Sequence, residues 1–238
     1  MKSIRDYITG LFIFVLCLLA GCLARPVPGD DAADQRIWDS SQNIYIDKGT
    51  LISRLVSADY ILLGEIHDNP IHHQIQEEVL EAVVSRGGRP ELVMEMLDID
   101  EQPAIDKFRE NPDDLEAFNQ ATGFAKKGWD WPMYRPLIKT MLDQRLPIMA
   151  ANLSRTELMQ VVRGSLTDLP DEIRQLVKQS GGLTVAQQEE LKQDILDSHC
   201  GKLPLDIAPG MAQAQIARDA MMALQLKKSS KPAVLIAG

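Results

Sequence analysis

The sequence predicts an α/β fold in which a mostly parallel sheet is flanked by helices and a helical insertion forms a subdomain. Two observations lead to this prediction. Short, continuously apolar runs recur along the chain, which is typical of strands buried on both faces of a parallel sheet. Longer segments with helical spacing separate these runs. The predicted core strands are residues 60–63, 91–96, 148–151 and 233–237.

The first 21 residues have the features of a secretory signal. Lys2 and Arg5 precede an apolar run over residues 8–19, which is too short and wrongly flanked for an ordinary membrane span. The signal ends in Leu19-Ala20-Gly21-Cys22, which resembles the lipobox of bacterial lipoproteins. This resemblance implies cleavage before Cys22 and acylation of its thiol by chains such as palmitate. An ordinary cleaved signal followed by a chance cysteine is the alternative.

The residues after the signal indicate an anchored domain. Leu23 follows the cysteine where an aspartate typically causes inner-membrane retention, so we expect a lipid anchor in the outer membrane. Residues 22–36 contain prolines, a glycine and several aspartates but few apolar side chains, which indicates a flexible tether. The α/β domain would then occupy residues 37–238.

Cysteine usage and charge exclude two possibilities. Cys17 leaves with the signal and Cys22 would be acylated, so Cys200 stands alone and no intramolecular disulfide is expected. The full chain has 25 basic and 34 acidic residues. Removing the signal takes away two basic residues and one acidic residue, which leaves a net charge of −10. Such an acidic chain argues against nucleic-acid binding, which needs basic patches to neutralise phosphate.

Helical segments interrupt the predicted strands of the domain. An edge strand is expected near residues 43–46, followed by a helix over residues 48–56. Two helical insertions, about residues 97–128 and 153–210, follow the second and third core strands.

The last core strand lies at the end of the sequence. A central parallel strand needs neighbours on both sides, and a ligand-binding loop should follow it as one follows Gly64. The sequence stops at Gly238 instead. We therefore expect that the chain is truncated at its C-terminus.

The segment over residues 60–79 concentrates the polar chemistry of the chain. It holds three of the four histidines within seven positions. Its apolar strand is followed by Glu65, His67 and Asp68, and a helix begins after the break at Asn69-Pro70. In an open α/β sheet, ligands bind at the carboxyl ends of the strands. This strand-to-helix loop is therefore the first candidate site.

Carboxylates and a histidine are expected to meet at this end of the sheet. Glu65 and His67 are two residues apart and project to one side if the strand geometry persists. With Glu95, at the end of the second strand, they could bind a divalent metal that activates water. The alternative is that Glu65 orients the loop by accepting backbone amides while His67 is a hydrogen-bonded imidazole. Asn152 and Gly238 end the other two strands.

Histidines and aromatic residues could form a second kind of site. His72 and His73 lie in the first turn of a helix and point about 100° apart, so one could donate to an anion while the other faces solvent. Trp129, Trp131 and Tyr134 cluster before a later helix, and flat apolar walls suit a planar ligand. A tyrosine phenolate can bind haem iron, although packing is the more frequent role of buried tryptophans.

Two lysines and the fourth histidine add weaker signals. Lys126 and Lys127 could pair with haem propionates, although exposed lysines are usually solvated. The His199-Cys200 pair is more often structural than a ligand site.

Several motifs in the same order resemble the ChaN-like haem-binding lipoproteins, a haem-binding uptake group related to Tiki proteases and erythromycin esterases. The resemblance covers nearly all of the mature chain. It rests on Gly64-Glu65-Ile66-His67-Asp68-Asn69-Pro70, His72-His73, Glu95-Met96, Trp129-Asp130-Trp131, Tyr134, residues 147–155 and His199-Cys200-Gly201. The Asn-Gly-His sequence that normally follows Ala-Gly in the last strand of this family is absent here.

The resemblance implies an α/β fold with a helical subdomain and a haem-induced homodimer that holds two haems face to face. A tyrosine of one protomer would bind iron, while a histidine and a lysine of the other contact the propionates. In this chain the implied haem-binding residues are Tyr134, His72 or His73, Lys126 or Lys127, and Trp131.

The leading hypothesis is a lipid-anchored haem-binding protein, not an enzyme, that serves haem or iron acquisition at the outer membrane. Its partners would be haem, the lipid bilayer, a second copy of the chain and an outer-membrane haem receptor. The competing hypothesis is a divalent-metal-dependent hydrolase that uses Glu65, His67 and Glu95. A haem-independent envelope scaffold is a third hypothesis.

Overall fold

The computed structural model describes residues 36–110, 114–164, 169–179, 183–198 and 203–238. The predicted signal, the predicted acylation site Cys22, the predicted tether up to residue 35 and the His199-Cys200 pair lie outside the described residues. The chain divides into two compact units, Met1–Leu51 and Ile52–Gly238.

The first unit contains a β-hairpin. Strands β1 (Ile37–Asp39) and β2 (Ile44–Ile46) pair antiparallel, and a left-handed residue, Asn43 with φ 57°, turns the chain between them. Trp38 and Tyr45 face each other across the pair, with ring centroids 4.8 Å apart. The strand near residues 43–46 is therefore confirmed, but it belongs to this hairpin and not to the edge of the main sheet.

The second unit contains a parallel sheet with four strands in the described part of the chain. In spatial order they are β3 (Tyr60–Gly64), β6 (Ala233–Ala237), β4 (Glu91–Asp98) and β5 (Ile148–Asn152). The last strand in sequence lies between the first two, and it pairs with both. The prediction of an α/β fold with four core strands is confirmed.

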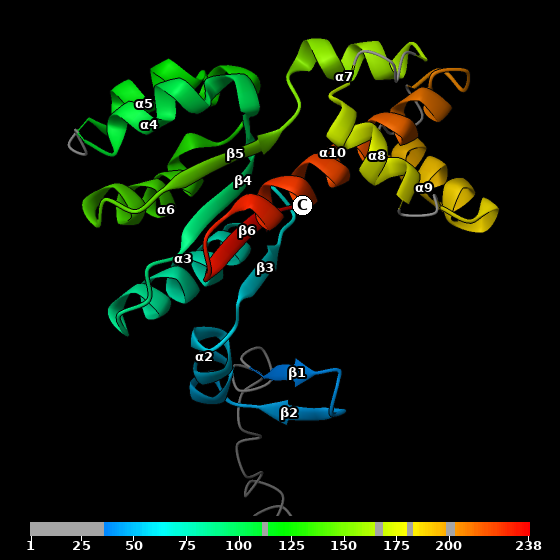
Figure 1. The fold of residues 1–238 in the computed structure, drawn as a ribbon. Helices are drawn as coiled ribbons and strands as arrows, with labels where there is room; N and C mark the ends of the chain where they lie inside the picture. The colour runs from blue at the N-terminus through cyan, green and yellow to red at the C-terminus, as the bar shows by residue number, and fades with distance from the viewer. Residues whose placement is uncertain (1–35, 111–113, 165–168, 180–182, 199–202) are drawn as a thin grey trace, which may run out of the picture. The chain divides into compact units, whose positions relative to one another are not determined.

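Side-chain alternation along the strands divides the core between the two faces of the sheet. Leu92 and Met94 point to one face, where they pack with α3 (Pro70–Ser85) and α6 (Trp131–Asp143). Val93 points to the other face, where it meets the helix α10 (Ala208–Lys228). Figure 1 shows α10 crossing the sheet on the side opposite α3 and α6. The central strands are therefore covered on both faces.

Helices fill the two predicted insertions. None of the helices in the described part of the chain is long and apolar enough to cross a membrane. Helices α7 (Arg155–Val162) and α8 (Asp171–Gln179) pack with α10 around a separate apolar core. This core includes Leu153, Ile173 and Ala217. The remaining elements are α2 (Lys48–Val56), η2 (Ile99–Glu101), α4 (Gln102–Phe108), α5 (Leu115–Thr122), η3 (Ala125–Lys127) and α9 (Val185–Ser198).

Side-chain caps start the helices that follow two of the strands. The Asn69 side chain accepts a hydrogen bond from the Ile71 amide at 3.0 Å, and Pro70 occupies the first turn of α3, where its missing amide is not needed. Ser154 and Glu157 form a capping box at the start of α7. These caps determine where each loop after β3 and β5 ends.

A central and an edge strand of the sheet predict unequal costs for the same substitution. Leu92→Ala in β4 removes a fully buried side chain and should lower the free energy of unfolding by about 2–5 kcal/mol. Leu62→Ala in β3 is the control, because Leu62 is 64% exposed and its loss should change that free energy by less than about 0.5 kcal/mol. Urea denaturation measures both values. Equal decreases in the free energy of unfolding for the two variants would show that β4 does not lie at the centre of the core.

Candidate functional site

Three strand ends meet at the carboxyl edge of the sheet. The Glu65 amide, just after β3, donates to the Ala237 carbonyl at 2.9 Å. The Gly238 amide, just after β6, donates to Oε2 of Glu95 in β4 at 3.0 Å. A side chain at position 238 would not fit, because a Cβ there would lie 2.4 Å from the Glu65 carbonyl oxygen. The glycine thus lets Glu65 and Glu95 flank the end of the same strand.

Glu65 carries a fully buried carboxylate that receives three side-chain hydrogen bonds. Its Oε1 accepts from Nδ1 of His67 at 2.8 Å and from the Tyr134 hydroxyl. Its Oε2 accepts from Nε2 of Gln76 at 2.7 Å, and Nδ1 of His73 lies 3.7 Å away. Burial by itself raises the pKa of Glu65, but these donors together lower it below the ordinary value. The group is therefore a carboxylate held by donors from the loop, α3 and α6.

His67 is the site residue whose ring reaches the surface. Its side chain is 40% exposed, and its ring meets the edge of Trp129 with centroids 4.8 Å apart. Since Nδ1 is held by Glu65, Nε2 is the nitrogen left over, and it has no hydrogen-bond partner among the described residues. The hydrogen bond that Nδ1 of His67 donates to Glu65 raises the pKa of His67, and the negative charge of Glu95 adds to this effect.

The two pKa shifts determine the pH range in which the Glu65–His67 contact stabilises the fold. The pKa of Glu65 lies below its ordinary value of 4.5, so the stability it contributes is lost as the pH falls through the depressed pKa. The pKa of His67 lies above its ordinary value of 6.5, so its contribution is lost as the pH rises through the raised pKa. The contact is therefore strongest between these two limits.

His72 and His73 have different surroundings, as their spacing predicted. Nδ1 of His72 accepts a hydrogen bond from the Ile66 amide at 2.8 Å, and the side chain is partly exposed. His73 is 4% exposed, and its Nε2 donates to the His67 carbonyl at 2.9 Å. Both side chains thus hold the loop against the start of α3, and His72 keeps Nε2 free to donate.

Tyr134 and Trp131 lie in the core. Tyr134 is completely buried between the rings of His73 and Phe124, and burial together with the Glu65 carboxylate raises its pKa. Trp131 is 8% exposed and packs on Phe118 and Phe124. Packing therefore explains Trp131, and Tyr134 keeps its proton for Glu65 in this structure.

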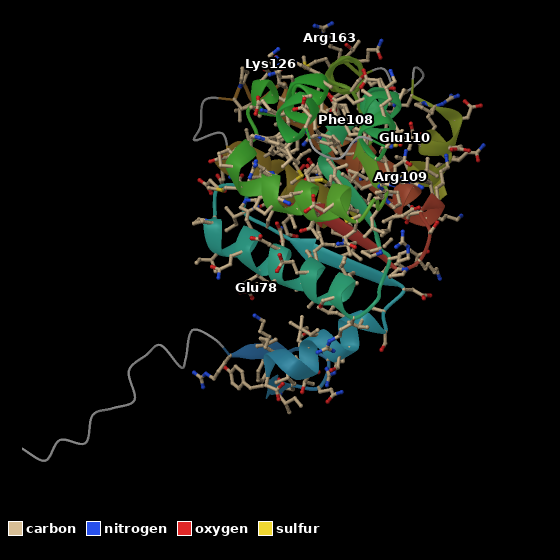
Figure 2. The ribbon with its side chains drawn as sticks, turned by 90° about the vertical axis from the view of Figure 1, so that its left-hand side faces the viewer. Glu78, Phe108, Arg109, Glu110, Lys126 and Arg163 are labelled. Carbon is tan, nitrogen blue, oxygen red and sulfur yellow. The ribbon has the colours of Figure 1, made fainter. Side chains whose placement is uncertain are left out.

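The two predicted lysines differ in their partners. Lys127 forms an ion pair with Glu101 at 2.7 Å and lies 3.7 Å from Asp98. Lys126 extends from the surface without an ion-pair partner among the residues that the structure describes (Figure 2). Lys126 is thus the lysine that is available to an added anion.

Glu95 lies on the far side of β6 from Glu65 and has a different partner. It is 1% exposed, and its Oε1 lies 3.6 Å from a guanidinium nitrogen of Arg218 in α10. Sequence reasoning missed Arg218, although a single arginine among the small apolar residues of an amphipathic helix was a usable signal.

Within the described residues, no group of three or more His, Cys, Asp or Glu side chains is placed to hold a metal ion. The predicted Glu65, His67 and Glu95 set is therefore occupied by internal contacts.

A cavity of about 340 Å³ opens beside these residues, between the strand ends and α10. Trp129 and Arg218 belong to its wall, so it adjoins both His67 and Glu95. Burial raises the pKa of Asp98, another wall residue, to about 6, and the Lys127 ion pair opposes that shift.

The fold and the sequence agree on the family. The family described as haem-binding uptake, Tiki superfamily, ChaN matches residues 51–238. The chain belongs to the ChaN haem-binding uptake family. No curated protein matches the sequence.

A solved member of the ChaN family has a similar structure. It is described as cofacial haem binding to ChaN of Campylobacter jejuni, and it is 25% identical in sequence with a TM-score of 0.72. The similarity covers 85% of this chain and 79% of that one. The fold of this chain is therefore similar to that of the Campylobacter jejuni protein over most of its length.

The Glu65 hydrogen bonds predict a change in the titration of His67. Glu65→Gln removes the negative charge beside Nδ1, so the pKa of His67 should fall toward 6.5. Histidine ring resonances followed by NMR against pH measure the pKa. Glu81→Gln is the matched control, because it removes a carboxylate from the exposed side of α3 and should leave the titration unchanged. A His67 pKa that is the same in both variants would contradict the role of Glu65.

Proposed function

We propose that this protein binds haem for haem or iron acquisition, as a lipid-anchored protein of the outer membrane. Membership of the ChaN haem-binding uptake family supports haem as the ligand, and the related Campylobacter jejuni structure contains cofacial haem. The observation that carries the proposal is the state of His67. One of its nitrogens is held by a carboxylate while the other is exposed beside an indole ring.

The donor set fits haem iron. A histidine that ligates a metal usually donates its second N–H to a carboxylate, which orients the ring and makes the free nitrogen a better ligand. Glu65 does this for His67, and the flat side chain of Trp129 beside it suits the face of a porphyrin. Haem, when bound, would supply the iron chemistry, and His67 would hold the iron through Nε2.

The sequence suggests Tyr134 as the axial ligand instead. A tyrosine binds iron as a phenolate, and both burial and the adjacent Glu65 carboxylate oppose loss of the Tyr134 proton. The hydroxyl would also have to leave Glu65 and reach the surface. These costs favour His67.

Two residues near the loop suit the haem propionates. Nε2–H of His72 is free to donate, because the Ile66 amide fixes Nδ1 as the acceptor. Lys126 is an exposed ammonium without an ion-pair partner in the described part of the chain. We propose that both bind propionates across a homodimer interface in which two haems stack.

Replacement of the proposed ligand tests the function. Titration of haemin into the protein should give a Soret band, and His67→Ala should weaken haemin binding at least about tenfold and shift the band. Tyr134→Phe should leave the position of the band unchanged. Sedimentation velocity should show a haemin-dependent dimer.

The variants separate the parts of this proposal. If Tyr134→Phe shifts the band and His67→Ala does not, the tyrosine is the ligand and only the histidine assignment is wrong. If the unaltered protein gives no saturable Soret band, haem binding itself is wrong.

Haem affinity should also depend on pH in a defined direction. Iron and a proton compete for Nε2 of His67, so affinity should rise as the pH passes upward through the raised pKa of this residue, above 6.5. Haemin titrations at several pH values measure the midpoint of this rise. Glu65→Gln should move that midpoint to lower pH. If the midpoint is the same in Glu65→Gln and His67→Ala as in the unaltered protein, His67 is not the iron ligand.

A further inference from the structure

The wall of the cavity between the strand ends and α10 contains both apolar and polar residues. The apolar residues include Leu158 and Met159 of α7 and Ala214 of α10. The polar residues include Asn152 at the end of β5 and Arg218 of α10. Its volume of about 340 Å³ lies at the small end of the range for small-molecule sites, about 300–1,000 Å³. A ligand that fits it is small and has an apolar body with a polar end.

Two buried polar atoms at the cavity have no partner. Asn152 is 4% exposed, and its Oδ1 accepts no hydrogen bond among the described residues. Nε of Arg218 is likewise buried without an acceptor. Buried polar groups are nearly always paired in folded proteins, so these two wall residues are incompletely satisfied without a ligand. Both atoms are covered by protein, so each side chain would have to shift for a ligand in the cavity to pair with them.

The charges of the wall favour a negative ligand. Three of the wall residues are cations, Lys127, Arg155 and Arg218, and one is an acid, Asp98. Glu101 pairs with Lys127, and Glu95 lies on one side of Arg218. Arg155, at the start of α7, is exposed and has no ion-pair partner in the described part of the chain. The uncompensated positive charge of the wall therefore lies on Arg155, and an anionic group there would be attracted to it.

We infer that this cavity is a second ligand site, for a small amphipathic organic anion whose apolar body lies against α7 and α10 and whose acidic group faces Arg155 and Arg218. The site is distinct from the proposed haem site. None of His67, His72 and Lys126 belongs to its wall, and Trp129 alone is shared between the two. Such a ligand carries a carboxylate or sulfonate, on either an acyl chain or an aromatic ring.

A matched pair of fluorescent probes tests this inference. The probe 8-anilinonaphthalene-1-sulfonate has an aromatic body and a sulfonate, and N-phenyl-1-naphthylamine has the same body without the charge. The sulfonate probe should bind at one site per chain, at least about tenfold more tightly than the neutral probe. Displacement by octanoate or by 1-naphthoate then shows whether the site prefers an acyl or an aromatic acid.

Variants at the two ends of α7 locate the binding. Arg155→Gln should weaken binding of the sulfonate probe about five- to tenfold. Arg163→Gln is the control, because Arg163 is an exposed arginine at the other end of the same helix and outside the cavity wall (Figure 2). Arg163→Gln should leave the affinity for the sulfonate probe unchanged. Ala214→Met should block binding by filling the cavity, with circular dichroism to establish that the variant folds.

The same measurements define failure. Equal binding of the two probes, or no effect of Arg155→Gln and Ala214→Met, would show adsorption to exposed apolar surface and overturn the inference. Stoichiometric release of the probe by haemin would make the cavity part of the haem site and overturn it as well. His67→Ala should leave probe binding intact, so a failure of the haem assignment is distinguishable from a failure of this one.

Discussion

A single buried carboxylate organises the end of the sheet. An ionised group out of contact with water is tolerated only where hydrogen bonds and charges replace its hydration. Glu65 obtains these from three different elements, the loop after β3, helix α3 and helix α6. Each of these elements is therefore held to the others through one side chain. Loss of any one donor would leave the carboxylate less than fully paired and would loosen the loop.

The same carboxylate decides what the neighbouring groups can do. By accepting from Nδ1 of His67 it leaves Nε2 as the free nitrogen, and by accepting from the Tyr134 hydroxyl it keeps that group protonated. His67 therefore has a free nitrogen at the surface, whereas the Tyr134 hydroxyl is held in the core. A site that uses a tyrosine would need the opposite arrangement, with the hydroxyl exposed and the acid further away. In this structure the histidine, and not the tyrosine, presents a polar atom at the surface.

Much of this could be predicted from the sequence, because apolar runs and strand ends are local signals. The four core strands, the loop that carries Glu65 and His67, and its position beside Glu95 all follow from those signals and from the rule that parallel strands end at one edge. Packing of Trp131 was the more frequent of the two roles weighed from the sequence, but the contact of Tyr134 with Glu65 was not predicted, because the two residues are 69 positions apart. Arg218 is 123 residues from its partner Glu95, and no local pattern connects the two.

The hairpin in the first unit shows the same limit. Its second strand was recognisable from its apolar residues, but its partner was not, since pairing depends on the preceding turn at Asn43. Local propensity thus predicts the existence of a strand more reliably than its place in a sheet.

The two carboxylates on either side of β6 explain why two ligand sites can adjoin one strand end. Glu65 turns toward α3 and α6 and leaves the imidazole of His67 at the surface. Glu95 turns toward α10, where it pairs with one nitrogen of the Arg218 guanidinium and leaves Nε without a partner. Each acid therefore leaves one atom of its partner without a hydrogen bond. Beside Glu65 this atom is Nε2 of His67, and beside Glu95 it is Nε of Arg218. A metal-centred ligand suits the first and an organic acid suits the second.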